Sequence, residues 1–288
     1  MQWPNCGTKI KDYINGFTEL LARELRQDLI GIYLHGSLAT GSYFPPKSDI
    51  DILAVVRRNL PAGFLCDLGT MVAEYASTCP TVGNLECSII TLSTARHIPD
   101  PMPYEFHYSV VWHDRLLNKE VDYQGPRFDT DLFAHVLCVK KRGQCLYGQR
   151  IDRVFGEVPW SRFMFAILDD LDWVLAGENI LEAPYYCILN ICRVTQLLVE
   201  RREYTYSKLE GGLWGLGHFP ASLTPLIQKA LRIYRSDRPV CQAQRKTGGE
   251  EWDGAALLAF RDYARLEIEN LKIKSKDFVE GASRNRNA

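Results

Sequence analysis

The chain has 288 residues, of which 46% are hydrophobic and 24% are charged, and its formal net charge is −1. This is the composition of an ordinary globular protein with one large domain or two average ones. The near-zero charge argues against a nucleic-acid-binding protein, and no apolar run approaches the roughly 20 residues that a membrane helix needs. The first residues, "MQWPNCGTKIKDY", lack the basic start and apolar centre of a signal peptide.

The first half of the chain predicts helices interspersed with strands. Helical spacing of apolar residues occurs in residues 8–27 and again in residues 61–77. Short runs rich in β-branched and apolar residues predict five strands. They lie in residues 29–36, 49–56, 84–91 and 106–113, and in the segment 131–148, whose apolar run ends near Val139.

The second half of the chain predicts helices alone. Amphipathic patterns extend over residues 158–177, 183–203, 220–237 and 250–274, and the first two carry a proline near the start. The predicted fold class is therefore α+β, with a mixed-sheet domain in residues 1–157 and an all-α helical bundle in residues 158–275. The last residues, "EGASRNRNA", are small and polar, and we expect a disordered tail in residues 276–288.

Nine cysteines are scattered through the sequence, and none forms a CxxC pair. Several, including Cys138 and Cys192, lie inside apolar runs. This pattern favours reduced, mostly buried thiols in a cytoplasmic protein over a disulfide framework.

Two carboxylates occupy one face of a predicted inner strand in "HGSLATGSYFPPKSDIDILAVV". Residues two apart in a strand point the same way, so Asp49 and Asp51 project together. Burial of two adjacent unpaired carboxylates is costly, whereas Mg²⁺ takes one or two carboxylates and completes its shell with water and phosphate oxygens. Gly36 and Ser37 end the preceding strand, where free backbone N–H groups and a hydroxyl can hold phosphate. The stretch therefore predicts a site for a nucleoside triphosphate and a metal.

A third carboxylate lies in the next predicted strand, "GNLECSII". Glu86 is flanked by apolar residues, where an unpaired Glu is out of place. It fits a metal ligand or a general base that takes the proton of an attacking hydroxyl. A Glu on the solvent face of an edge strand is the alternative.

Residues 35–56 resemble the nucleotidyltransferase signature of the DNA polymerase β superfamily, Gly-Ser followed by two acids on the next strand. Along nearly its whole length the chain is also similar to aminoglycoside adenylyltransferases of the streptomycin- and spectinomycin-modifying type. The matching segments are "LECSII", "FHYSVVW", "DTDLFAHVL", "ILNICRV", "YSKLEGGLWGLGHFP" and "LIQKALRIY". The resemblance implies an N-terminal nucleotidyltransferase domain followed by a helical domain.

The resemblance implies three groups of site residues. The catalytic and metal-binding acids are Asp49, Asp51 and Glu86, with Glu86 also the base and two Mg²⁺ ions expected. The nucleotide contacts are Gly36, Ser37, Ser48, Asp131, Arg193, Lys208 and Tyr234. The acceptor contacts are Trp112, Glu178 and Glu182.

The residues alone leave other roles open for several of these side chains. Arg193 lies in an apolar helix and needs an anion, which a structural carboxylate also supplies. Lys208 also fits a solvated surface position, and Asp131 also fits a turn cap. Tyr234 and Trp112 also fit as packing aromatics.

The acids and the phosphate loop predict Mg²⁺-dependent nucleotidyl transfer, and the resemblance implies transfer of AMP from ATP to a hydroxyl of an aminoglycoside or aminocyclitol, with release of pyrophosphate. The expected partners are ATP and a small molecule, without membrane or nucleic acid, and we expect a monomer. Two alternatives share the signature: a nucleotidyltransferase acting on RNA or another small molecule, and a non-catalytic ATP-binding module.

Overall fold

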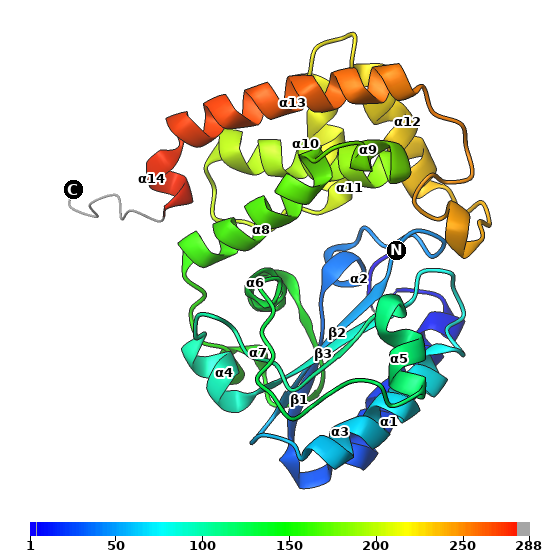
Figure 1. Cartoon of the computed structure of the whole chain (residues 1–288), viewed down its shortest axis with the longest axis vertical. Helices are drawn as coiled ribbons and strands as arrows, with labels where there is room; N and C mark the ends of the chain where they lie inside the picture. Colours follow the sequence, from blue (N-terminus) through cyan, green and yellow to red (C-terminus); the bar gives the residue numbers. More distant parts are fainter. Residues whose placement is uncertain (4, 281–288) are drawn as a thin grey trace. The chain divides into compact units, whose positions relative to one another are not determined.

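The computed structural model describes residues 1–3 and 5–280, which divide into two compact units after Val158 (Figure 1). The first unit contains a five-stranded mixed sheet and the second is helical throughout, which confirms the predicted fold class. Each unit is described by itself below.

The sheet of the first unit has the strand order β4-β3-β2-β1-β5. The central strands β2 and β3 are parallel, and every other neighbouring pair is antiparallel. The strands are β1 (Leu29–Leu34), β2 (Ile50–Val56), β3 (Leu85–Thr91), β4 (Phe106–Tyr108) and β5 (Gln144–Gly148).

Helices cover both faces of this sheet (Figure 1). Alternate strand residues, such as Ile52 and Ala54 of β2, join a buried cluster with the apolar faces of α1 (Thr8–Leu25) and α3 (Ala62–Ala76). The other face carries the acids and is covered by short elements that contact β2 and β3 or one another. These are α2 (Gly36–Thr40), α4 (Leu92–His97), α6 (Leu132–Arg142) and α7 (Ile151–Val154).

The segment 131–148 differs from the sequence prediction. Its apolar run forms helix α6, and the strand β5 comes after it. The buried residues of α6 recur at helical spacing, and three basic residues in its last turn favour the negative end of the helix dipole. Strand β5 is an exposed edge strand, which explains why it carries little apolar signal.

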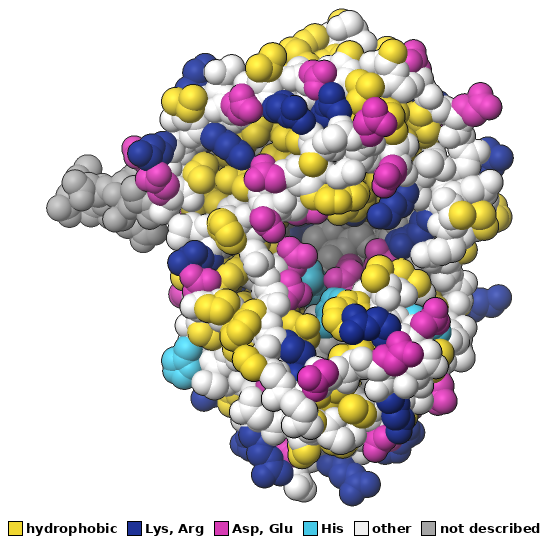
Figure 2. Space-filling view, viewed as in Figure 1, with side chains coloured by type: hydrophobic (Ala, Val, Ile, Leu, Met, Phe, Trp, Pro, Cys, Tyr) yellow, Lys and Arg dark blue, Asp and Glu magenta, His cyan; other side chains and the backbone are white. Residues whose placement is uncertain are grey.

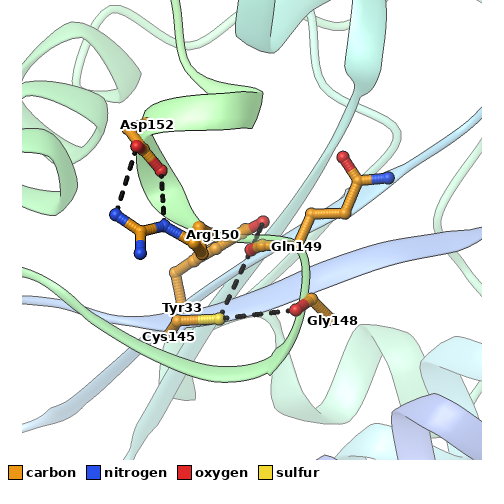
Figure 3. A network of polar contacts seen from close by, with 6 residues as sticks. All are labelled: Tyr33, Cys145, Gly148, Gln149, Arg150 and Asp152. Carbon is orange, nitrogen blue, oxygen red and sulfur yellow. Dashed lines mark hydrogen bonds and ion pairs between the residues drawn. The ribbon is translucent and has the colours of Figure 1, made fainter.

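The pairing of β1 with β5 is extended by a small polar network (Figure 3). Tyr33 donates its hydroxyl to the carbonyl of Gln149 over 2.8 Å, and the Cys145 thiol donates to the same carbonyl over 3.3 Å. Arg150 and Asp152 form an exposed ion pair at 3.0 Å just beyond the strand.

The segment 106–113 is a strand only at its start. After β4 the chain forms a 3-10 turn, η2 (Val110–Trp112), and then helix α5 (His113–Leu117). A further 3-10 turn, η1 (Arg26–Asp28), joins α1 to β1.

The second unit is built around α10 (Pro184–Glu200), which is buried over most of its circumference. It packs against five neighbouring helices. These are α8 (Trp160–Leu175), α9 (Asn179–Glu182), α11 (Lys208–His218), α12 (Thr224–Arg235) and α13 (Gly254–Lys274). A 3-10 turn, η3 (Gln242–Gln244), lies between α12 and α13.

The predicted disordered tail is wrong for its first residues. Lys276–Val279 forms helix α14, and the ring of Phe278 lies 5.2 Å from that of Trp160. Ser275, buried just before α14, donates its hydroxyl to the carbonyl of Leu198. Residues 281–288 lie outside the described residues.

All nine cysteines are free thiols. Four are buried, three are half-buried and two are exposed, so the expectation that most are buried is wrong. Across the part of the chain that the structure describes, no helix is long and apolar enough to cross a membrane. On the face shown in Figure 2, Lys and Arg side chains are intermingled with Asp and Glu, in keeping with the net charge of −1.

Candidate active site

The two aspartates lie at the start of β2, on the face that the alternation predicts. Ile50 and Ile52 are fully buried, while Asp49 and Asp51 retain partial solvent exposure on the opposite face. Asp51 is the direct ladder partner of Glu86 on the parallel strand β3. Paired residues of neighbouring strands point to the same side, about 4.8 Å apart. The three acids therefore share one face at one end of the sheet.

Gly36 brings the backbone against Asp51. Its φ angle is +62°, and a Cβ atom at this position would lie 1.8 Å from Oδ2 of Asp51. Glycine is therefore required by both the backbone conformation and the space. The preceding residue, His35, donates its N–H to the carbonyl of Asp51 over 3.0 Å, which fixes the loop to β2.

The hydroxyl oxygen of Ser37 is buried and has no hydrogen-bond partner among the described residues. A buried hydroxyl normally finds a partner, so an orphan in a loop that ends a strand indicates a place for a ligand oxygen. Ser48 differs, because its hydroxyl accepts the N–H of Phe44 over 3.1 Å and so closes the turn before β2.

The donor set suits Mg²⁺ in its chemistry, since Asp49, Asp51 and Glu86 offer hard carboxylate oxygens. Within residues 1–3 and 5–280, however, no three His, Cys, Asp or Glu side chains converge on one metal position. Oδ1 of Asp49 accepts the N–H of Asn84 over 3.2 Å, and Asp51 faces Gly36. The acids thus fit an ion that completes its shell with substrate oxygens, without forming a preassembled three-carboxylate cage.

Glu86 is the acid whose surroundings change its chemistry most. Its side chain is 32% exposed, yet neighbouring protein desolvates the carboxyl group and raises its pKa above the ordinary value. The carboxylates of Asp49, Asp131 and Asp129 raise this pKa further, and His135 opposes them. A carboxyl group with a raised pKa is better matched to proton transfer near neutral pH.

Three histidines gather near Glu86, and their spacing in the chain is not that of metal ligands. Nε2 of His135 lies 4.0 Å from Oε1 of Glu86, and its ring is 4.9 Å from that of buried His35. Nδ1 of His107 lies 3.0 Å from the Ser88 hydroxyl. Burial lowers the pKa of both His35 and His107; at His107 the Asp129 carboxylate opposes this shift, and His135 adds to it at both positions.

Asp131 precedes the first residue of α6, where its N–H donates to Oδ1 of Asp129 over 2.9 Å. Its charge acts on Glu86, so the structure brings it to the acid site. Trp112 lies in the turn η2, not in a strand, and packs against the buried cluster of the first unit. The guanidinium of Arg115 covers its ring at 4.7 Å.

Arg193 of the second unit has a carboxylate partner. Its Nη2 lies 3.5 Å from Oδ2 of Asp170 on α8, and its Nε is buried without a hydrogen bond among the described residues. Gly211 lets α11 approach here, because a Cβ atom at that position would lie 2.5 Å from the Arg193 backbone. The structural carboxylate that the sequence left open is therefore present.

Lys208 is the first residue of α11, after a capping box formed by Ser207 and Glu210. Its ammonium group lies 4.5 Å from the ring centre of Tyr186, whose hydroxyl donates to Asp170 over 3.4 Å. Lys208 is thus placed beside the Asp170–Arg193 pair instead of being a solvated surface residue. Tyr186 and Asp170 had no sequence signal beyond helical spacing.

Two further aromatic contacts complete this region. Tyr234 is 2% exposed and stacks on Tyr185 at 6.2 Å, as a packing aromatic would. Lys246 places its ammonium group 5.6 Å from the ring centre of Trp173 and 6.0 Å from that of Tyr186. Glu178 directly precedes the short helix α9, and Glu182 is its last residue. The charges of Asp170, Lys246 and Glu182 all act on the buried thiol of Cys187.

Two domain families match separate parts of the chain. Residues 18–124 match the nucleotidyltransferase domain, and residues 153–253 match the C-terminal domain of aminoglycoside adenylyltransferases. A spectinomycin 9-adenylyltransferase of Campylobacter jejuni is 22% identical over 262 residues, which are 90% of this chain and 95% of that protein. One of Enterococcus faecalis is 24% identical over 187 residues, which are 64% of this chain and 71% of that protein.

A solved structure of the spectinomycin adenyltransferase AAD(9) from Enterococcus, crystallised with ATP and spectinomycin, has a similar fold. The TM-score is 0.72 at 20% identity, and the match covers 90% of this chain and 99% of that one. The mixed-sheet unit thus contains a nucleotidyltransferase domain. With the matching second domain, the chain belongs to the aminoglycoside adenylyltransferases and is an adenylyltransferase enzyme.

Proposed function

We propose that the enzyme transfers AMP from ATP to a hydroxyl group of an aminocyclitol or aminoglycoside and releases pyrophosphate. The observation that carries this proposal is the register of β2 and β3, which sets Asp51 opposite Glu86 while Gly36 seats the phosphate loop against Asp51. The relatives that match this chain over most of its length are named spectinomycin 9-adenylyltransferases, which supports a spectinomycin-like acceptor.

In this proposal Asp49 and Asp51 would hold Mg²⁺. When bound, the ion neutralises negative charge that develops on the phosphates. The buried Ser37 hydroxyl donates to a phosphate oxygen, which would satisfy its missing hydrogen bond. Gly36 allows that phosphate to approach the backbone, because it has no side chain.

Glu86 acts as the general base. It takes the proton of the acceptor hydroxyl as that oxygen attacks the α-phosphorus of ATP, and the bond to the leaving pyrophosphate breaks on the opposite side. The raised pKa of Glu86 suits this role, because the carboxylate is a stronger base than an exposed Glu. Asp131 and the other carboxylates nearby contribute through their charge.

The second unit supplies further contacts in this proposal. Arg193 and Lys208 bind phosphate, with Asp170 holding the guanidinium in place beforehand. Tyr234 borders the adenine. Trp112, Glu178 and Glu182 contact the acceptor, whose ammonium groups favour acidic neighbours.

The test is release of pyrophosphate from ATP and Mg²⁺ in the presence of spectinomycin, streptomycin and related acceptors. Asp49→Asn and Glu86→Gln should each lower turnover at least about a hundredfold, the scale of a removed catalytic group. Asp67→Asn is a matched control, because Asp67 is exposed in the same unit and pairs with Lys119 on the surface. Circular dichroism verifies that each variant is folded.

Near-normal turnover in a folded Asp49→Asn or Glu86→Gln variant would refute the mechanism. If wild-type protein binds ATP but releases no pyrophosphate with any acceptor, the proposed acceptor class is wrong. Adding tRNA to the panel tests an RNA acceptor directly.

A further inference from the structure

His135 links the catalytic carboxylate to the phosphate loop. It lies on α6 one helical turn after Asp131, so the two side chains project from the same side of that helix. Its Nε2 lies 4.0 Å from Oε1 of Glu86. Its ring packs on that of His35, with the ring centres 4.9 Å apart and the planes at 38°.

His35 connects this contact to the rest of the site. It is 4% exposed, donates its N–H to the carbonyl of Asp51, and directly precedes Gly36 at the start of α2. Helices α2 and α6 are themselves in contact. One imidazole therefore touches both the base on β3 and the residue that anchors the phosphate loop to β2.

Glu86 needs a group that fixes its orientation. Its side chain is partly exposed, and the neighbouring charges of Asp49, Asp129 and Asp131 all repel its carboxylate. Among the groups that act electrostatically on Glu86, His135 is the one that favours the carboxylate form. A ring nitrogen 4.0 Å from this otherwise repelled carboxylate attracts it electrostatically, and so biases its orientation toward one side of the site.

We propose that His135 is a positioning residue for this reaction, which orients the carboxylate of Glu86 relative to the phosphate loop through its contacts with Glu86 and His35. The proposal rests on the proposed function in assigning Glu86 as the base. His135 need not touch the substrate, and its effect passes through Glu86.

The test compares His135→Leu, which keeps the bulk but removes the ring nitrogens, with His135→Gln, which retains an N–H donor. His135→Leu should lower kcat about tenfold, the usual effect of losing a group that orients a catalytic ligand, with KM for ATP changed less than about twofold. His135→Gln should stay within about threefold of wild type. His97→Leu, at the exposed end of α4, is the control and should leave both constants unchanged.

Action through Glu86 is tested by a double-mutant cycle in kcat. In the Glu86→Gln background, His135→Leu should cause no further loss. An additive loss, an equal loss in the Leu and Gln variants, or an effect confined to KM would overturn the proposal. If His135→Leu does not fold, His135→Met takes its place in the cycle.

A second cycle requires neither nucleotide nor acceptor. The free energy of unfolding in urea is measured for wild type, His135→Leu, Glu86→Gln and the double variant. A partly exposed pair of this kind should show coupling of about two- to fivefold in the folding equilibrium constant. Absence of coupling between His135 and Glu86 in the free energy of unfolding overturns the proposal. Absence of pyrophosphate release by the wild-type protein refutes the proposed function instead. In that case the unfolding cycle still decides whether His135 acts on Glu86.

Discussion

Glycine at position 36 meets two requirements, a positive φ angle and close approach to the Asp51 side chain, and alanine variants can separate them. Gly36 has φ +62°, and an added Cβ would lie 1.8 Å from Oδ2, 2.5 Å from Cγ and 3.0 Å from Cβ of Asp51. Gly41 ends the same short helix with φ +83°, but an added Cβ there meets nothing closer than 3.7 Å. Gly41→Ala is therefore a control that shares the backbone strain without the collision.

Both alanine variants should lose about 1–2 kcal/mol of unfolding free energy, because each places an L-residue in the left-handed region. The Asp51 carboxylate is the end of a side chain and can rotate away, so the collision adds little further loss of stability. That rotation removes the proposed metal ligand, and Gly36→Ala should lose at least about a hundredfold in kcat while Gly41→Ala keeps most activity.

The assays are urea unfolding and pyrophosphate release at saturating ATP, performed on both variants. Equal activity in folded Gly36→Ala and Gly41→Ala would refute the reasoning, because the close approach to Asp51 would then have no catalytic consequence. A much larger loss of stability in Gly36→Ala alone would show that Asp51 cannot rotate, and would contradict the predicted division between stability and activity.

Two further predictions concern surface charge and pH. Lys246→Ala should lower KM for a cationic acceptor about two- to fivefold, because it removes a positive charge that acts on the same Cys187 thiol as Glu182, a proposed acceptor contact; Lys229→Ala removes a similar cation–aromatic contact with Trp252 and should have no effect. Burial lowers the pKa of His107 in the folded protein. As the pH falls below the pKa of about 6.5 that His107 has in the unfolded chain, the unfolded chain therefore binds a proton that the folded protein does not. The free energy of unfolding then falls by up to about 1.4 kcal/mol per pH unit, until the pH reaches the pKa of His107 in the folded protein. His107→Gln should reduce this loss between pH 8 and pH 5.5 in urea unfolding, and exposed His97→Gln should not; equal slopes would contradict the assignment.

The acids of the site could be located from sequence because strand geometry has a period of two. Alternation in "DIDILAVV" places Asp49 and Asp51 on the face opposite Ile50 and Ile52, and the structure has this arrangement. The pairing of Asp51 with Glu86 could not be predicted from the sequence, because the register of two strands depends on contacts between residues far apart in the chain.

His135 was missed because its segment was assigned to the wrong element. A run of eight largely apolar residues, "LFAHVLCV", fits a buried strand or a buried helix equally well by periodicity. If the segment were a strand, Asp131 and His135 would be about 13 Å apart along the chain. Because the segment forms helix α6, they are one helical turn apart, and both act on the pKa of Glu86. The misassigned element therefore concealed a contact of the site itself.

The second unit shows why single residues predict their partners poorly. Arg193 in an apolar helix indicates an anion, but nothing local selects Asp170, which precedes it by 23 residues on another helix. The partner is decided by how α8 packs against α10, and α11 packs closely against the same part of α10 at Gly211, where any side chain would meet the Arg193 backbone at 2.5 Å. The glycines of "KLEGGLWG" thus explain how α11 reaches the backbone of α10 at Arg193. A Gly211→Ala substitution should accordingly displace α11, and with it Lys208, before it disturbs the buried core of α10.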